Sequence, residues 1–231
     1  MVSLQFPEGK KVFATHGESV LCSEDRADVS ALAPCSHEEA DSRMMIHAFD
    51  ASLNGFRRIM IQSNDTDVVV LAVSIAPLLP LNELWISYGS SKHVRNLPAH
   101  AIATSVGREK ACVLPMFHAL TGCDTVSFFG GRGKKSAWDV WKVFPELTHT
   151  LKALMMLPED IDEACMGVIE RFVVLLYDRT SSLRKVNEVR QELFSRKVRS
   201  LENTPPPPKH PYRNISRELY SKVVMYGARP C

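Results

Sequence analysis

The 231-residue chain lacks several features that would assign it to a class at once. Its six cysteines form no Cys-x-x-Cys pair, so the sequence gives no zinc knuckle. No apolar run approaches the ~18 residues of a membrane-spanning helix, and residues 1–10 carry no apolar core of a secretion signal. We therefore expect no membrane partner. Scattered cysteines between apolar residues favour a reducing, intracellular setting; a nuclear location fits too, without a clear targeting signal.

An excess of charge of one sign is also missing. Lys and Arg number 28 and Asp and Glu 26, so the net charge of +2 does not by itself indicate a nucleic-acid-binding protein. Hydrophobic residues make up 45% and charged residues 23%, which is typical of a globular chain that can bury one sizeable core. Any contact with nucleic acid must therefore come from local clusters of charge.

What the sequence does contain is an alternation of strand and helix patterns. Strands are expected at 11–22 (two short strands around His16-Gly17), 59–63 and 84–88. Helices are expected at 36–54, after a Ser-x-x-Glu capping box, and at 98–106 and 111–121. The run Val68 to Leu79 is apolar on all sides and fits a buried strand or a buried helix. This alternation predicts an α/β fold with a largely parallel sheet.

The C-terminal third has a different pattern. Residues 146–200 are expected to be helical, with a basic helix from Arg184 to Arg199, and Pro205 to Pro208 begin a polyproline linker. The predicted domains are a core at 1–145, a helical extension at 146–202, and a Pro-rich linker and tail at 203–231. The basic residues after 178 face few acids, which fits contacts to several phosphates and equally fits a solvated helix face.

The most informative stretch is Asp65-Thr66-Asp67, which follows the apolar strand at 59–63. Side chains alternate along an extended chain, so both carboxylates are expected on the same side. Two like charges held close together repel unless a cation lies between them, and strand ends are where α/β folds bind ligands. A metal site is one interpretation, and an Asp-rich turn is the other.

Further acids accompany this pair. Glu38, Glu39 and Asp41 lie at a helix start, and Asp124 follows Gly122-Cys123. Hydrolysis of a phosphodiester by two Mg²⁺ or Mn²⁺ ions needs several carboxylates from different elements. Acids at a helix start also cap the helix and favour its dipole, and Asp124 alone fits a simple turn, so these alternatives stay open.

A glycine turn gives an independent indication. Gly131-Arg132-Gly133 is followed by Lys134 and Lys135 at the start of an expected helix of about ten residues, which offers N–H groups and positive charge to a phosphate. It is not a Walker A loop, because Phe128 stands where that loop needs its first glycine.

The order of these motifs resembles the flap endonuclease-like branch of the PIN-like 5′ nucleases. Glu39-Ala40-Asp41 matches that family's acidic helix start, Asp65-Thr66-Asp67 its Asp-x-Asp, and Gly122-Cys123-Asp124 its Gly-Cys-Asp. Gly131 to Ala137 matches its helix-hairpin-helix turn. The sequence also resembles a group of animal proteins built around His-Glu-Glu-Ala-Asp, Asp-Thr-Asp and His-Ala-Leu-Thr-Gly-Cys-Asp-Thr.

The resemblance implies a three-layer PIN-like sandwich with a partly parallel sheet and a helix-hairpin-helix-like element at 124–144. It implies metal ligands at Glu39, Asp41, Asp65, Asp67 and Asp124. It also implies phosphate contacts at Gly131, Gly133, Lys134 and Lys135 on duplex or branched DNA, or on RNA. Arg43 could reach the scissile phosphate, and an exposed or carboxylate-paired arginine is the alternative. The family has earlier strands with further aspartates that are not found before residue 36, so we expect an N-terminally truncated sheet.

The function expected from these motifs is that of a metal-dependent, structure-specific nuclease. One alternative is a catalytically inactive nuclease-like module that binds nucleic acid or another partner, which the missing strands favour. A further alternative is a haloacid-dehalogenase-like phosphatase, with Asp65 as nucleophile and Asp67 as acid and base. The phosphatase leaves Glu39 and the glycine turn unexplained.

Overall fold

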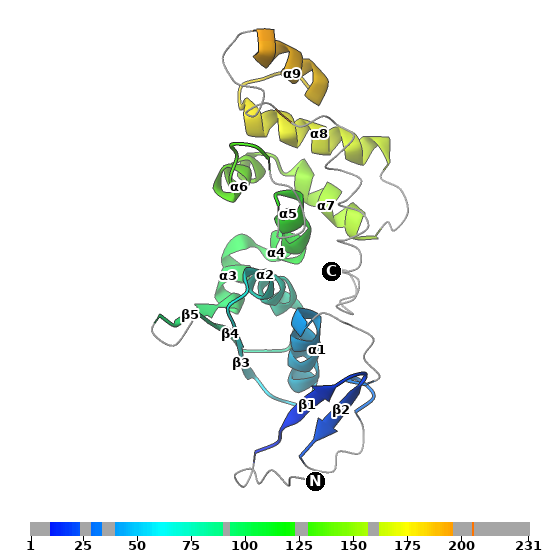
Figure 1. Ribbon diagram of the computed structural model, residues 1–231, viewed down its shortest axis with the longest axis vertical. Coiled ribbons are helices and arrows are strands. Elements are labelled where there is room, and N and C mark those ends of the chain that lie inside the picture. Colours follow the sequence, from blue (N-terminus) through cyan, green and yellow to red (C-terminus); the bar gives the residue numbers. More distant parts are fainter. Residues whose placement is uncertain are drawn as a thin grey trace.

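A small mixed sheet, flanked by three helices, separates a β-hairpin from a helical part in the computed structural model (Figure 1). The structure describes residues 10–23, 29–33, 40–89, 93–122, 129–156, 162–195 and 205. The hairpin consists of β1 (Phe13–His16) and β2 (Ser19–Cys22), joined at Gly17 with φ +59°, as predicted. It contacts α1 (Ala40–Leu53) through Thr15 Oγ1 and His47 Nε2, which are 3.1 Å apart.

The sheet has the order β3 (Arg58–Ser63), β4 (Glu83–Tyr88), β5 (Arg95–Pro98). β3 and β4 are parallel, with Ile59 opposite Leu84, and β5 pairs antiparallel with β4. The two strands expected at 59–63 and 84–88 and a partly parallel sheet are thus confirmed, but the sheet is not largely parallel. Sequence patterns missed β5, because Arg95-Asn96-Leu97-Pro98 lacks a β-branched or aromatic residue. Its proline is tolerated on an edge strand.

The apolar run after Asp67 is a helix. α2 (Thr66–Ile75) continues into the short 3₁₀ helix η1 (Ala76–Leu78) and connects the parallel strands β3 and β4. Val68, Leu71, Ala72 and Ile75 recur at helical spacing and are buried. Tertiary packing on one face therefore outweighs the strand preference of the three consecutive valines at 68–70.

Helices α1, α2 and α3 (Ala99–Val106) lie along one side of the sheet in Figure 1. Ile61, Leu84 and Ile86 point toward them and are buried in a core cluster that runs from Met45 to Ala111. On the opposite face of β3, Met60 keeps 61% of its surface exposed. The described part is a mixed α/β unit whose helices cover the inner face of β3.

The helical part begins where a single helix was expected at 111–121. α4 (Arg108–Cys112) ends, and α5 (Leu114–Leu120) starts anew with Pro115 in its first turn. Proline lacks an N–H donor, which is tolerated only there, and so it divides the expected helix. The remaining described helices are α6 (Lys134–Val143), α7 (Glu146–Met156), α8 (Glu163–Tyr177) and α9 (Val186–Ser195).

A second core cluster holds these helices together. It runs from Val113 to Leu193 and centres on Phe117, which stacks on Trp141 at 4.3 Å between ring centroids. Leu114 packs against both clusters. The second cluster spans residue 145, where the first predicted domain ends; the domain limits themselves stay a prediction. The basic helix expected from Arg184 to Arg199 is described as far as Ser195.

Two further findings bear on the setting of the chain. None of the described helices combines the length and apolar character that a membrane span requires. Cys112 is disulfide-bonded, whereas Cys22 and Cys165 are free thiols. A disulfide does not support the expected reducing setting.

Candidate functional site

The predicted carboxylates lie at the junction between the end of β3 and the start of α2. Asp65 is the N-cap of α2, with extended backbone angles (φ −95°, ψ 131°), and its Oδ1 accepts a hydrogen bond of 2.8 Å from the N–H of Asp67. Ser63 Oγ in turn accepts the N–H of Asp65 at 3.0 Å. The extended backbone expected through Asp67 is therefore wrong, because Asp67 belongs to the first turn of a helix.

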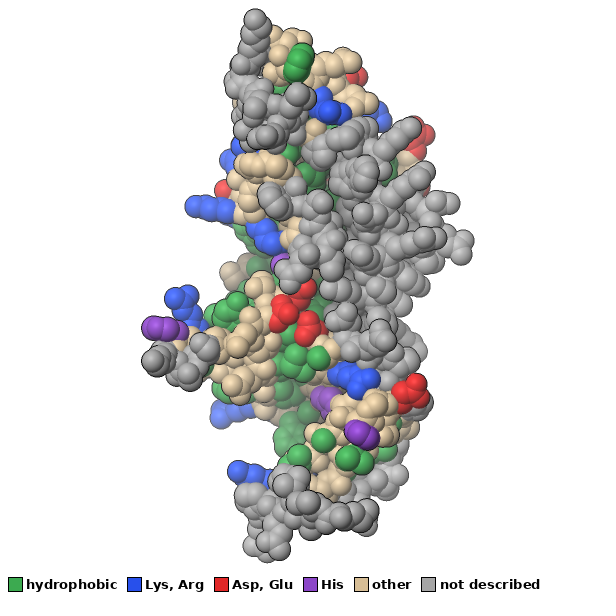
Figure 2. All heavy atoms as spheres, viewed as in Figure 1, with side chains coloured by type: hydrophobic (Ala, Val, Ile, Leu, Met, Phe, Trp, Pro, Cys, Tyr) green, Lys and Arg blue, Asp and Glu red, His purple; other side chains and the backbone are tan. Residues whose placement is uncertain are grey.

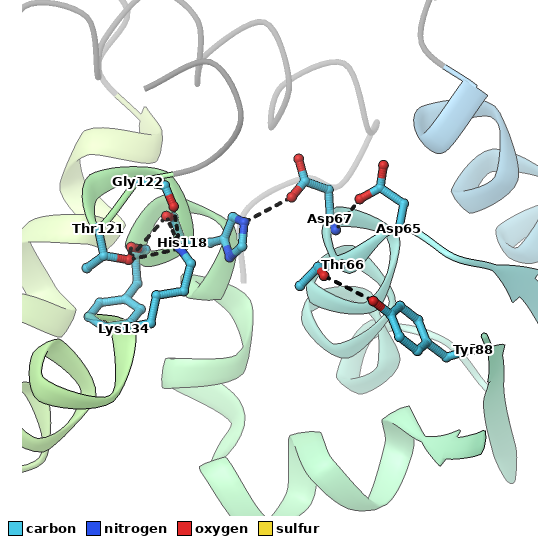
Figure 3. Close-up of polar contacts among 9 residues, drawn as sticks. Asp65, Thr66, Asp67, Tyr88, His118, Thr121, Gly122 and Lys134 are labelled. Atoms are coloured by element: carbon cyan, nitrogen blue, oxygen red, sulfur yellow. Dashed lines mark hydrogen bonds and ion pairs between the residues drawn. The ribbon is translucent and has the colours of Figure 1, made fainter. Parts of the chain in front are cut away.

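The expectation that the two carboxylates share a side nevertheless holds. Figure 3 shows Asp65 and Asp67 side by side, with both carboxylates pointing away from the body of α2. The N–H groups and the dipole at a helix N-terminus favour negative charge. Part of the repulsion between the two acids is thus offset by the helix N-terminus.

The partner of Asp67 was not predicted from the sequence. His118 Nε2 on α5 lies 2.9 Å from Asp67 Oδ1, and the two side chains keep only 13% and 23% of their surface exposed. The pair joins α5, which belongs to the helical core, to α2, which belongs to the α/β core. No spacing rule finds such a contact, because Asp67 and His118 are brought together by tertiary packing.

One lysine that follows the glycine turn, Lys134, binds the end of α5 through its ammonium group. Lys134 Nζ donates to the carbonyl oxygen of His118 at 2.9 Å, to Thr121 Oγ1 at 3.3 Å and to the carbonyl oxygen of Gly122. A cation there offsets the negative end of the α5 dipole. Lys134 and Lys135 are both exposed, and they differ in that the ammonium group of Lys134 is bound to the end of α5.

The two glycines of the turn differ as well. Gly131 has φ +68°, a left-handed conformation that favours glycine. Gly133 has extended backbone angles, and a Cβ atom at this position would meet no other atom within 4 Å, so its backbone conformation does not demand glycine. Only Gly131 is required by the shape of the turn.

The other predicted site residues are distributed as follows. Arg43 Nη1 donates to the carbonyl oxygen of Gly17 at 2.9 Å, which ties α1 to the hairpin. Asp41 lies half-buried in the first turn of α1. Glu39 and Asp124 fall outside the described residues, as does the capping box from Ser36. The structure thus brings together Asp65 and Asp67 and adds His118.

Carboxylate oxygens are the donors that Mg²⁺ and Mn²⁺ prefer, so the chemistry of Asp65 and Asp67 fits such an ion. Their number is small: within the described ranges, no three His, Cys, Asp or Glu side chains gather closely enough to hold a metal. A complete set of ligands would need contributions from residues such as Glu39 and Asp124.

The surroundings of the carboxylates are open on one face of the molecule. In Figure 2, acidic side chains gather at the level of α2, and Lys and Arg side chains lie over the helical part above them. Thr66 Oγ1 and Tyr88 Oη, 3.5 Å apart, close the site on the side of the sheet (Figure 3). Such an arrangement suits a nucleic-acid backbone: the acids would hold metal ions, and the basic groups would contact the phosphates.

No family model matches the chain, no curated protein matches its sequence, and no solved structure matches it. A functional assignment therefore depends on the local geometry of the residues themselves.

Proposed function

We propose that the chain is a nuclease-like hydrolase of the PIN-like, flap endonuclease-like type, which acts on phosphodiester bonds of DNA or RNA. The observation that carries the proposal is the position of Asp65 and Asp67 at the carboxyl end of β3, side by side and directed outward. Ligands bind at this end of the strands in α/β sheets. The proposal includes the three-layer sandwich, in which further elements would cover the exposed outer face of β3 at Met60.

Asp65 and Asp67 would hold a divalent cation, joined by Asp41, Glu39 and Asp124. When bound, Mg²⁺ or Mn²⁺ ions activate a water molecule and offset the charge on the leaving oxygen. Asp65 caps the N-terminus of α2, and its Oδ1 accepts a hydrogen bond from the N–H of Asp67. This bond fixes the first turn of the helix and so the position of the second carboxylate.

The nucleic-acid strand would be held by the glycine turn. Exposed Lys135 supplies a positive charge beside Gly131, and Lys134 shapes the turn through its bonds to the end of α5. Exposed Arg184, between α8 and α9, would extend the contact to a further phosphate, whereas Arg179 and Lys185 are paired with Asp139 and Glu170. Binding of this kind weakens as the salt concentration rises, because each neutralised phosphate releases counterions.

A second candidate is a nucleic-acid-binding or interaction module without catalysis. The contact between Asp67 and His118 favours it, because one oxygen of the Asp67 carboxylate is already bound within the chain. Where the partner is nucleic acid, the two candidates differ in cleavage and in the requirement for a metal ion.

Cleavage of a labelled flap or hairpin DNA separates the candidates. With Mg²⁺ or Mn²⁺ present, the wild type is expected to cut, and Asp67→Asn is expected to fall to the level of a reaction without protein. Asparagine keeps the oxygen that His118 contacts, so the variant removes the charge and retains the packing. Glu188→Gln, an exposed acid on α9, is the matched control and should cut like the wild type.

Three other outcomes would reject or redirect the proposal. Salt-sensitive binding without cleavage by any variant would establish the non-catalytic module. Absence of both would contradict both candidates. Turnover of a generic phosphomonoester that Asp65→Asn alone abolishes would favour the haloacid-dehalogenase-like phosphatase.

A further inference from the structure

His118 is held at both its backbone and its side chain. Its carbonyl oxygen accepts the ammonium of Lys134 at 2.9 Å and the hydroxyl of Thr121 at 3.2 Å. Its imidazole Nε2 lies 2.9 Å from Asp67 Oδ1 and is largely shielded from solvent. The first two contacts hold the backbone of His118 at the end of α5, and the third holds the imidazole at Asp67.

The helix that carries His118 is packed into the helical core. Its neighbours Phe117 and Ala119 are buried in the helical core, where Phe117 stacks on Trp141. His118 is only partly exposed and points out of this core, toward the N-terminus of α2 (Figure 3). The imidazole therefore crosses from one core cluster to the other.

We propose that His118 is a positioning residue for the carboxylate site. Through Nε2 it fixes the orientation of the Asp67 carboxylate beside Asp65, so that the helical part of the chain determines the geometry of the acid pair. The inference rests on the proposed function, since it assigns His118 a role at the same site.

The contacts form a continuous series. Lys134 Nζ binds the carbonyl oxygen of His118, His118 Nε2 binds Asp67 Oδ1, and the N–H of Asp67 binds Asp65 Oδ1. Groups that hydrogen-bond to a metal-ligating side chain set its orientation, and their removal costs metal affinity. A purely structural contact between α2 and α5 would change stability and leave that affinity unchanged.

Two polar substitutions of His118 distinguish these roles. In His118→Gln the amide nitrogen reaches about as far as Nε2, so it can still donate to Asp67. In His118→Asn the amide nitrogen takes the place of Nδ1 and falls short of Asp67. Both variants lose the aromatic ring, so the comparison between them isolates the reach of the amide. His149→Asn, at an exposed position on α7, is the control.

The measurement is the affinity of each purified full-length protein for Mn²⁺ alone, with its thermal unfolding midpoint recorded beside it. We expect His118→Asn to weaken Mn²⁺ binding about tenfold or more, and His118→Gln and His149→Asn to stay within about threefold of the wild type.

The outcomes separate this inference from the proposed function. Equal affinity of His118→Asn and the wild type, with binding abolished in Asp67→Asn, would overturn the role of His118 and keep the metal site. Equal weakening in His118→Gln and His118→Asn would also overturn it, because the hydrogen bond would then not matter. A wild type that binds no Mn²⁺ would reject the metal-dependent function itself, and with it the positioning role.

Discussion

The end of β3 and the glycine turn carry the two halves of the predicted chemistry, and they use their charged residues in opposite ways. At the end of β3, Asp65 and Asp67 are directed outward from a helix N-terminus. At the glycine turn, the ammonium group of the exposed Lys134 binds the carbonyl groups that end α5. The comparison teaches that helix ends decide the contacts of a charge: an acid at an N-terminus accepts a backbone N–H, whereas a lysine beside a C-terminus donates to backbone carbonyl oxygens.

The largest expected effect comes from breaking the core on which α5 lies. Trp141 is fully buried, stacks on Phe117 and donates its Nε1–H to Thr148 Oγ1 at 2.9 Å. Trp141→Ala should lower the free energy of unfolding by about 3 to 5 kcal/mol, because it leaves a cavity and an unpaired hydroxyl. Denaturant unfolding measures this. A loss below about 1 kcal/mol would contradict the packing described for the helical part.

Substitutions of Lys134 and Lys135 test whether a lysine serves the stability of the fold or the binding of DNA. Lys134→Met should cost about 1.5 kcal/mol of stability, because carbonyl groups at the end of α5 lose a charged donor. Lys135→Met should stay within about 0.5 kcal/mol of the wild type, since its side chain is exposed. DNA binding should respond in the other order, with Lys135→Met reducing the salt dependence by about one phosphate contact. If both variants have the same free energy of unfolding, Lys134 does not stabilise the end of α5 and this account of the two lysines is wrong.

At the other region, two substitutions of Asp65 separate capping from charge. Asp65→Ala removes the N-cap of α2 and should cost about 1 kcal/mol, whereas Asp65→Asn can still accept the N–H of Asp67 and should cost only about a few tenths. Thermal unfolding gives the comparison. If both variants lose equal stability, the negative charge and not the cap stabilises this helix start.

The smallest effect concerns pH and the hairpin. Burial lowers the pKa of His47 below its usual 6.5; Asp50 opposes that shift and Arg43 adds to it. The unfolded chain therefore takes up a proton at a higher pH than the folded chain does, so the contribution of His47 is full above pH 6.5 and falls as the pH is lowered. Unfolding measured between pH 7.5 and 5.5 should show this decline, and it should be smaller in His47→Gln. An unchanged decline in that variant would assign the effect to other groups.

Much of the α/β unit could be predicted because its strands are short apolar runs between turn residues. The strands at 59–63 and 84–88 follow from that pattern, and so does the hairpin around Gly17. The conformation of the run at 68–79 could not be decided, because nearly all of its residues are apolar and the helical spacing of the buried positions does not show in the sequence. The break at Pro115 was readable in principle from the missing N–H donor.

The site was predictable only in part. The identity of Asp65 and Asp67 follows from their place after an apolar strand, but the helix start that orients them depends on a hydrogen bond between neighbours. The contacts of His118 and Lys134 depend on how α5 packs between two cores, which no local pattern encodes. Metal binding, activity and the contribution of Glu39 and Asp124 stay predictions.

Paramagnetic broadening by Mn²⁺ tests the central claim most directly, because it reports where the ion binds. When Mn²⁺ is added to isotope-labelled protein, the backbone signals of Asp65, Thr66 and Asp67 should disappear first, followed by that of His118. The double variant Asp65→Asn/Asp67→Asn should keep these signals under the same conditions. Broadening centred on other acids, such as those of α9, or identical broadening in the double variant, would contradict the assignment of the carboxylate pair as a metal site.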